Sequence, residues 1–126
     1  MKPRLLMMAA GALLAWPAFA HHSTANFDRS MQIEITGVVT RFQFSNPHSL
    51  IQMDVVNDAS GETQSYSVFA TSRVVLLRYG WRPESIAPGE TIRITGHPDF
   101  DNPHFVYLTG IRFADGSEWS RNEILE

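Results

Sequence analysis

The sequence predicts an all-β domain with one short helix, arranged as a five-stranded barrel of the OB type. Apolar residues alternate with polar ones in five separate runs, and a short helical segment lies between the third run and the fourth. In the first and last runs the inward-facing positions change parity close to a glycine, which is typical of a bulged, bent strand that serves two sides of a barrel. A small β-sandwich and an incomplete barrel of other topology are the alternatives.

The first three strands form a predicted meander. Apolar residues before Gly37 are Ile33 and Ile35, and those after it are Val38, Phe42 and Phe44. We therefore expect the first strand to change its inward face and to bend at Gly37. A turn at 46–47 ends this strand, and the second and third strands, centred on 51–55 and 66–68, flank a turn at 58–61.

A short helix and two further strands complete the predicted barrel. Ser72 is a suitable N-cap and Gly80 a suitable residue just past the end of a helix of about two turns. Strands follow at 92–94 and 105–113, the second with a parity change at Gly110. The chain then turns into a short tail. This order of elements favours the OB-like barrel over the alternatives.

The first 20 residues have the organisation of an export signal. Lys2 and Arg4 precede an apolar stretch of about a dozen residues, and the Ala-Phe-Ala sequence at 18–20 matches a signal-peptidase site. The apolar stretch is shorter than the roughly 20 residues that cross a bilayer. We therefore expect cleavage after residue 20, a single domain at 21–126, and a periplasmic or secreted protein that is not embedded in the membrane.

Composition narrows the function classes. The absence of cysteine excludes disulfides and thiolate metal sites. Loss of Lys2 and Arg4 with the signal leaves eight basic residues against thirteen acidic ones, so the net charge falls from −3 to about −5. Such a protein is poorly suited to nucleic acid, whose binding depends on neutralising phosphates. Motifs of serine hydrolases, phosphate-binding loops and zinc proteases are missing, so we expect no catalytic residues and a binding protein rather than an enzyme.

Four of the five histidines form a candidate metal site. The predicted ligands are His21, His22, His48 and His104. As the first residue after cleavage, His21 offers both an imidazole and an α-amine. The other two end a repeated Phe-x-Asn-Pro-His frame, at 44–48 and 100–104, in loops expected to converge beside the ligand-binding face of an OB barrel. Amine and imidazole nitrogens suit Cu(II) in a tetragonal site better than Zn(II) or Ni(II).

Other interpretations of the same residues stay open. Residues 21–30 reach at most ~33 Å when extended, enough to return along a strand of ~20 Å to the loops. Asn-Pro is also a common turn former, so the loop histidines are alternatively turn and packing residues of a module that binds a partner protein or small ligand without metal. Asp101 is a candidate oxygen ligand or an acceptor for a histidine, and His97 is expected to be structural. A copper oxidase with an N-terminal histidine brace is a third, less favoured hypothesis.

The chain also resembles a family of small exported proteins. The stretches that carry the resemblance are His21-His22-Ser23, Phe27-Asp28, Thr36-Gly37-Val38-Val39, Asn46-Pro47-His48-Ser49, Leu77 to Trp81, Pro88-Gly89-Glu90, Thr95-Gly96-His97-Pro98 and Ala114-Asp115-Gly116. Together they are similar to the domain of unknown function 6152. This resemblance implies an exported barrel and no particular activity. The matched histidines are His21, His22 and His48, whereas His104 departs from the family pattern, whose corresponding loop often resembles a glycine-containing turn.

Overall fold

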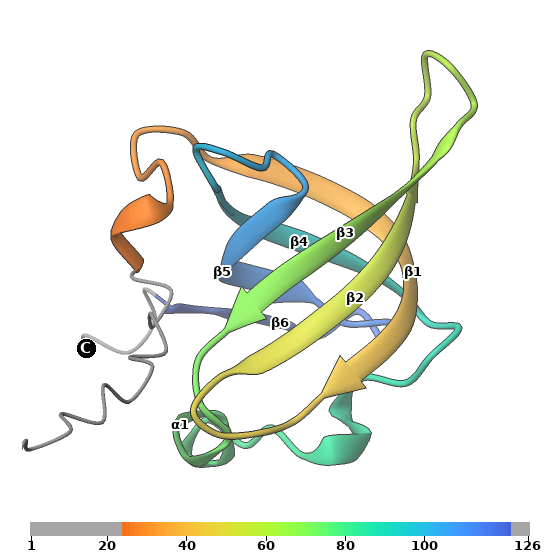
Figure 1. The fold of residues 1–126 in the computed structure, drawn as a ribbon. Coiled ribbons are helices and arrows are strands. Elements are labelled where there is room, and N and C mark those ends of the chain that lie inside the picture. The colour runs from red at the N-terminus through yellow and green to blue at the C-terminus, as the bar shows by residue number, and fades with distance from the viewer. Residues whose placement is uncertain (1–23, 122–126) are drawn as a thin grey trace, which may run out of the picture.

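The computed structural model describes residues 24–121, which form a closed five-stranded barrel with a short sixth strand (Figure 1). The strands are β1 (Ile33–Gln43), β2 (Ser49–Val56), β3 (Thr63–Ala70), β4 (Thr91–Pro98), β5 (Phe105–Arg112) and β6 (Glu118–Ser120). The helices are the 3-10 turns η1 (Thr24–Asn26) and η2 (Pro83–Ser85) and the α-helix α1 (Arg73–Arg78). Antiparallel neighbours follow the order β3-β2-β1-β4-β5, and parallel pairing of β3 with β5 closes the barrel. The predicted fold class is therefore confirmed.

β1 serves two sides of the barrel, as predicted, but its parity changes later than expected. Its first half pairs with β4 and its second half with β2. A bulge between Val39 and Arg41 shifts the register, so Val39 is buried while Val38 is 43% exposed. The prediction that Val38 faces inward after a change at Gly37 is wrong. The glycine has another role, because a Cβ at Gly37 would overlap the carbonyl oxygen of Asp54 on β2.

β5 contains the second predicted change of parity. Its register with β4 shifts so that Thr109 is an extra residue between Leu108 and Gly110. Leu108 and Ile111 are both buried in consequence, which confirms the change of inward face. Beyond the following turn, β6 pairs antiparallel with β5, where the sequence predicts only a tail.

α1 begins and ends at the predicted residues. The Ser72 hydroxyl accepts a hydrogen bond from the N–H of Val75 at 3.3 Å. Gly80 has a φ of 85°, and the N–H groups of Gly80 and Trp81 donate to carbonyls of the last turn in a Schellman arrangement. Leu76 is fully buried, so the helix packs on the barrel core and closes the lower end of the barrel in Figure 1.

The core fills the barrel with side chains from all five strands and from the α1 region. Its buried members are Val39, Ile51, Met53, Val68, Ala70, Leu76, Trp81, Ile86, Ile92, Ile94, Val106, Leu108 and Ile111. Each large apolar side chain in this set contributes about 1.5–3 kcal/mol to folding relative to full exposure. Within residues 24–121, no helix has the length and apolar character needed to cross a bilayer.

Candidate functional site

Two of the four predicted ligands, His21 and His22, lie outside the described residues, as does the predicted signal peptide. The described part of the candidate site therefore consists of the segment that follows them, residues 24–31, and of the loop histidines His48 and His104.

Segment 24–31 is docked on the outside of the barrel. The backbone of Phe27 forms an isolated bridge with Asp99, and the N–H of Asp28 donates to the carbonyl of Pro98 at 2.8 Å. The Phe27 side chain is 4% exposed because it packs against three outward-facing rings. These are Phe69 on β3, with ring centroids 6.0 Å apart, and Phe105 and Tyr107 on β5, at 5.3 and 5.4 Å. Phe27 therefore holds the segment against β3 and β5.

His48 lies on this same outer face. Its ring centroid is 4.4 Å from that of Phe69, the ring on which Phe27 also packs. The side chain is exposed, so its imidazole is accessible to a metal ion. The Ser45 hydroxyl donates to the carbonyl of His48 at 2.8 Å, and the buried Ser49 hydroxyl bonds to the backbone of Ser45. These bonds hold the loop that carries His48.

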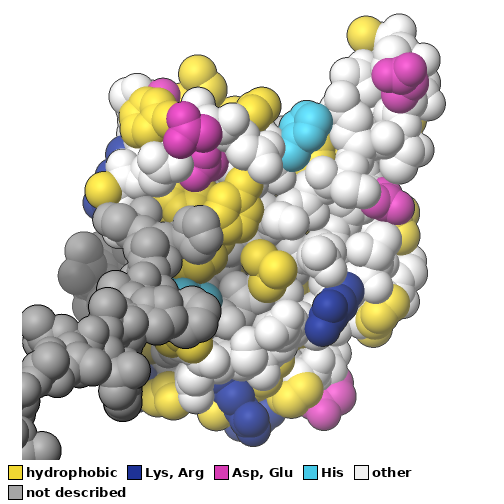
Figure 2. Space-filling view, viewed as in Figure 1, with side chains coloured by type: hydrophobic (Ala, Val, Ile, Leu, Met, Phe, Trp, Pro, Cys, Tyr) yellow, Lys and Arg dark blue, Asp and Glu magenta, His cyan; other side chains and the backbone are white. Residues whose placement is uncertain are grey.

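His104 lies elsewhere on the barrel. Its ring centroid is 4.6 Å from that of Tyr66, which packs against the core, whereas Phe69 faces outward. Because Tyr66 and Phe69 are three residues apart on β3, the two histidines contact positions about 10 Å apart and of opposite parity. Histidine side chains appear at separate places in Figure 2. The structure does not bring His48 and His104 together as expected, and in its described residues no three His, Cys, Asp or Glu side chains form a metal-binding group.

Asp99 and Asp101 shape the β4–β5 loop. One carboxylate oxygen of Asp99 accepts from the N–H groups of Asp101 and Asn102 at 2.8 and 3.0 Å. The Asn26 amide donates to Asp99 at 2.7 Å and to Asp101 at 3.3 Å. Asp101, predicted as a ligand or as an acceptor for a histidine, therefore accepts from an asparagine and ties the loop to η1.

His97 is held against segment 24–31. Its Nδ1 lies 2.7 Å from the carbonyl oxygen of Met31, which fits the structural role expected for it. The neighbouring Asp28 has a pKa below its usual value, chiefly because the Ser30 hydroxyl donates to its carboxylate at 2.6 Å, with a smaller effect of charge on His97. This arrangement occupies one nitrogen of His97 in positioning the segment.

A family model matches residues 10–110, and it describes a family of unknown function, DUF6152. The chain belongs to this family. The matched range includes β1 to β4 and most of β5, and with them His21, His22, His48, His97 and His104. A search of the curated proteins finds no match to this DUF6152 chain. The family therefore carries no activity over to it, and function must be argued from the chain's own residues.

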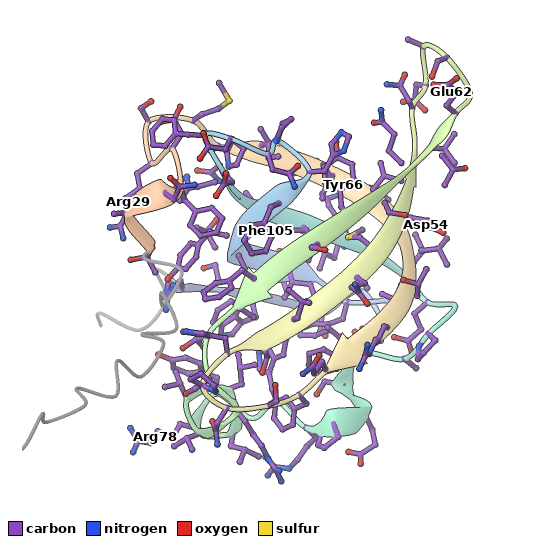
Figure 3. All side chains as sticks on the ribbon, in the orientation of Figure 1. Arg29, Asp54, Glu62, Tyr66, Arg78 and Phe105 are labelled. Carbon is purple, nitrogen blue, oxygen red and sulfur yellow. The ribbon has the colours of Figure 1, made fainter. Side chains whose placement is uncertain are left out.

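In this DUF6152 protein, the outer aromatic cluster is the part of the site that sequence reasoning missed. Phe69, Phe105 and Tyr107 have the parity of outward-facing residues, yet Phe69 is only 7% exposed. Figure 3 shows Phe105 on β5 beside β3, from which Tyr66 projects. The sequence does contain a signal for this cluster. Large apolar residues occur at both parities in β3 and β5, which indicates that both faces of these strands are covered. Phe27, isolated in a polar stretch, packs on all three rings of this outer face, while His48 covers Phe69 and Arg121 lies over Tyr107.

Proposed function

We propose that this protein is an exported Cu(II)-binding protein whose ligands are His21, with its α-amine and imidazole, His22 and the loop residue His48. The amine and imidazole nitrogens are suited to a tetragonal copper site. Export and signal cleavage after residue 20 are parts of this proposal, because cleavage at that bond is what creates the free amine. Binding, for delivery, sensing or buffering of copper, is proposed rather than catalysis.

The ring series Phe27–Phe69–His48 supports this proposal most strongly. It fixes the beginning of the described chain on the same outer face as His48. Thr24 is one 3-10 turn from Phe27, with the Phe27 N–H 3.4 Å from the Thr24 carbonyl oxygen. The three residues before Thr24 span at most about 10 Å of chain. His48 is therefore a better third imidazole for this site than His104, whose ring packs on Tyr66 instead.

Calorimetric titration with Cu(II) tests the role of the amine. We expect processed protein that begins at His21 to bind copper at least about tenfold more tightly than protein with one extra N-terminal alanine, a difference of ~1.4 kcal/mol. The extra residue moves the free amine away from the His21 imidazole. Equal affinities would remove the α-amine, and with it the proposed site.

The two loop histidines offer a matched pair of variants. We expect His48→Ala to weaken Cu(II) binding by about tenfold and His104→Ala to change it by less than about twofold, because a lost ligand costs on the order of 1.4 kcal/mol. Equal effects of both variants would contradict the assignment of His48. A larger effect of His104→Ala would move the site to the β4–β5 loop.

A groove near the β4–β5 loop favours a second candidate function, that of an interaction module without metal. It has a volume of about 360 Å³ and is lined in part by Met31, Tyr66 and Phe100. Met31 and Phe100 are 51% and 65% exposed, so together they offer apolar surface to a partner beside the groove. In that case changes at His48 leave the metal content of the exported protein unaltered, and metal analysis of the protein purified from its own compartment distinguishes the two functions.

A further inference from the structure

A cavity separate from the histidines lies where the chain leaves α1. Its walls come from the end of α1, from η2 and from the turn between β5 and β6, and its volume is about 440 Å³. The aromatic residues that line it are Tyr79, Trp81, Phe113 and Trp119. A volume of this size accommodates a small organic molecule.

The four aromatic rings of the cavity form one continuous series. Tyr79 and Trp119 have ring centroids 5.7 Å apart, and Trp119 and Trp81 have centroids 5.3 Å apart at an interplanar angle of 81°. Phe113 meets Trp81 at 5.1 Å and 70°. Edge-to-face packing sets neighbouring rings at steep angles to one another. Ring faces carry the negative end of the aromatic quadrupole and attract cations.

Both tryptophans of this wall have an unpartnered indole N–H. Trp81 is 3% exposed, and its buried Nε1 finds no acceptor among residues 24–121. The buried Nε1 of Trp119 is in the same situation within the described chain. Buried polar groups are normally hydrogen-bonded, so these two nitrogens are exceptions, and both are closed to solvent within the wall of the cavity.

The charged side chains that line the cavity are acidic. Its carboxylates are Glu84, Glu90, Asp115 and Glu118, and none of the described residues that line it is basic. Only Glu118 is paired with a cation, the Arg112 side chain at 3.7 Å, and Glu90 accepts from the N–H of Ala87 at 3.2 Å. The carboxylate of Glu84 has no hydrogen-bond or ion-pair partner among residues 24–121. An acidic, aromatic cavity attracts organic cations and repels anions.

We propose that this cavity binds a small organic ammonium ion. The ammonium group lies against the aromatic wall with Glu84 as counter-ion. This site uses none of the histidines and does not depend on the proposed copper site.

Tryptophan fluorescence of the exported protein tests the proposal, because Trp81 and Trp119 line the cavity. The probe is choline, titrated into protein freed of metal by a chelator. The control ligand is 3,3-dimethylbutan-1-ol, in which carbon replaces the charged nitrogen. We expect choline to change the emission saturably, with half-saturation below about 10 mM, and the neutral analogue to bind at least about fivefold more weakly. Failure of choline to bind, or equal binding of both ligands, would overturn the proposal.

Matched variants locate the binding to this cavity. We expect Tyr79→Leu and Glu84→Gln each to weaken choline binding by about fivefold. The control is Glu62→Gln, which removes the same charge at the projecting β2–β3 turn, at the end of the molecule away from Arg78 and α1 (Figure 3). Loss of choline binding in Glu62→Gln equal to that in Glu84→Gln would reduce the effect to net charge and contradict the assigned site. Thermal unfolding of each variant verifies that it is folded.

Discussion

The first Asn-Pro-His loop and the second share four of their five residues but differ in what surrounds them. In the first loop Phe44 packs on Phe42 at 5.6 Å and lies beneath the Arg73 guanidinium. In the second loop Phe100 is 65% exposed. The Asn46 side chain accepts from the N–H of Val74 at the start of α1, outside its own loop. A repeated sequence frame therefore does not build a repeated site.

Contacts with neighbouring elements explain the difference. The first loop lies beside α1, and the N–H of Arg73 donates to the carbonyl of Ser45 at 3.0 Å. The second loop lies beside segment 24–31, and the N–H of Phe100 donates to the carbonyl of Asn26 at 3.0 Å. Each loop takes its conformation from the element against which it rests. The histidine that ends it is aimed accordingly, His48 at the outer face and His104 at Tyr66.

The largest expected effect distinguishes Phe27, on segment 24–31, from Phe100, on the second loop that this segment contacts. We expect Phe27→Ala to lower the free energy of unfolding by about 3 kcal/mol, because it empties a buried aromatic position. Phe100→Ala should change it by less than about 0.5 kcal/mol, because the side chain is mostly in water. Urea unfolding measures both. Similar losses in the two variants would mean that segment 24–31 is not anchored through Phe27.

The next largest effect on stability is expected for the buried hydroxyl of Ser49, which holds the first loop. Ser49 is fully buried, and its hydroxyl bonds to both the N–H and the carbonyl of Ser45 at 3.2 Å. We expect Ser49→Ala to lower the free energy of unfolding by about 1–2 kcal/mol, since it leaves the Ser45 N–H without its acceptor while the Ser45 carbonyl keeps only the bond from Arg73. The control is Ser45→Ala, whose more exposed hydroxyl should matter less. The reverse order, measured by denaturant titration, would contradict this view of the loop.

The two asparagines test directly whether the loops differ. Asn46 accepts from Val74 across 3.3 Å, while Asn102 accepts from His104 at 3.0 Å within its own turn. We expect Asn46→Ala and Asn102→Ala each to cost roughly 0.5–1 kcal/mol of stability. Backbone NMR shifts distinguish them, because the first variant should perturb α1 and the second only the β4–β5 loop. Perturbation confined to the altered loop in both variants would make the loops equivalent after all.

The smallest effect is a pH dependence at segment 24–31. Hydrogen bonding from Ser30 holds the pKa of Asp28 below its usual 3.8, so the folded state favours the ionised carboxylate. This contribution to stability is present above about pH 4 and is lost as the pH falls through the lowered pKa. We expect Ser30→Ala to lower the melting temperature slightly at pH 6, with the difference vanishing toward pH 2. Ser117→Ala, which removes the corresponding bond to Asp115 at the β5–β6 turn, is the matched control.

The barrel could be predicted from the sequence because its strands and helix are determined mainly by residues close together in the chain. The caps at Ser72 and Gly80 and the alternation in β2 and β4 follow from neighbouring residues, and all are found as predicted. The sequence places the bulge in β1 too early, because Val38 and Val39 are both apolar. Which of them faces inward depends on the pairing with β2 beyond the bulge, and a single strand's sequence does not contain that information.

The candidate site was less predictable because it depends on contacts between distant segments. Nothing near Phe27 in the sequence indicates that it packs between Phe69 and Phe105, about forty and eighty residues away. The separation of His48 from His104 likewise depends on the offset of β5 along β3, where Phe105 pairs with Ser67. An OB topology places the two loops near one face but does not determine which way each histidine points.

The parallel pairing of β3 with β5 is the shortest strand pairing in the closed barrel. It has three paired positions, from Ser67 to Phe69, whereas β2 and β3 have eight. Phe27 lies across this strand pair, because its ring contacts Phe69 on β3 and both Phe105 and Tyr107 on β5. Segment 24–31 thus holds β3 and β5 together, and detachment of Phe27 favours separation of these two strands. By thermodynamic linkage, a ligand that keeps segment 24–31 docked also protects the backbone amides of β3 and β5 from hydrogen exchange with solvent. A ligand that draws the segment away weakens the pairing of these two strands.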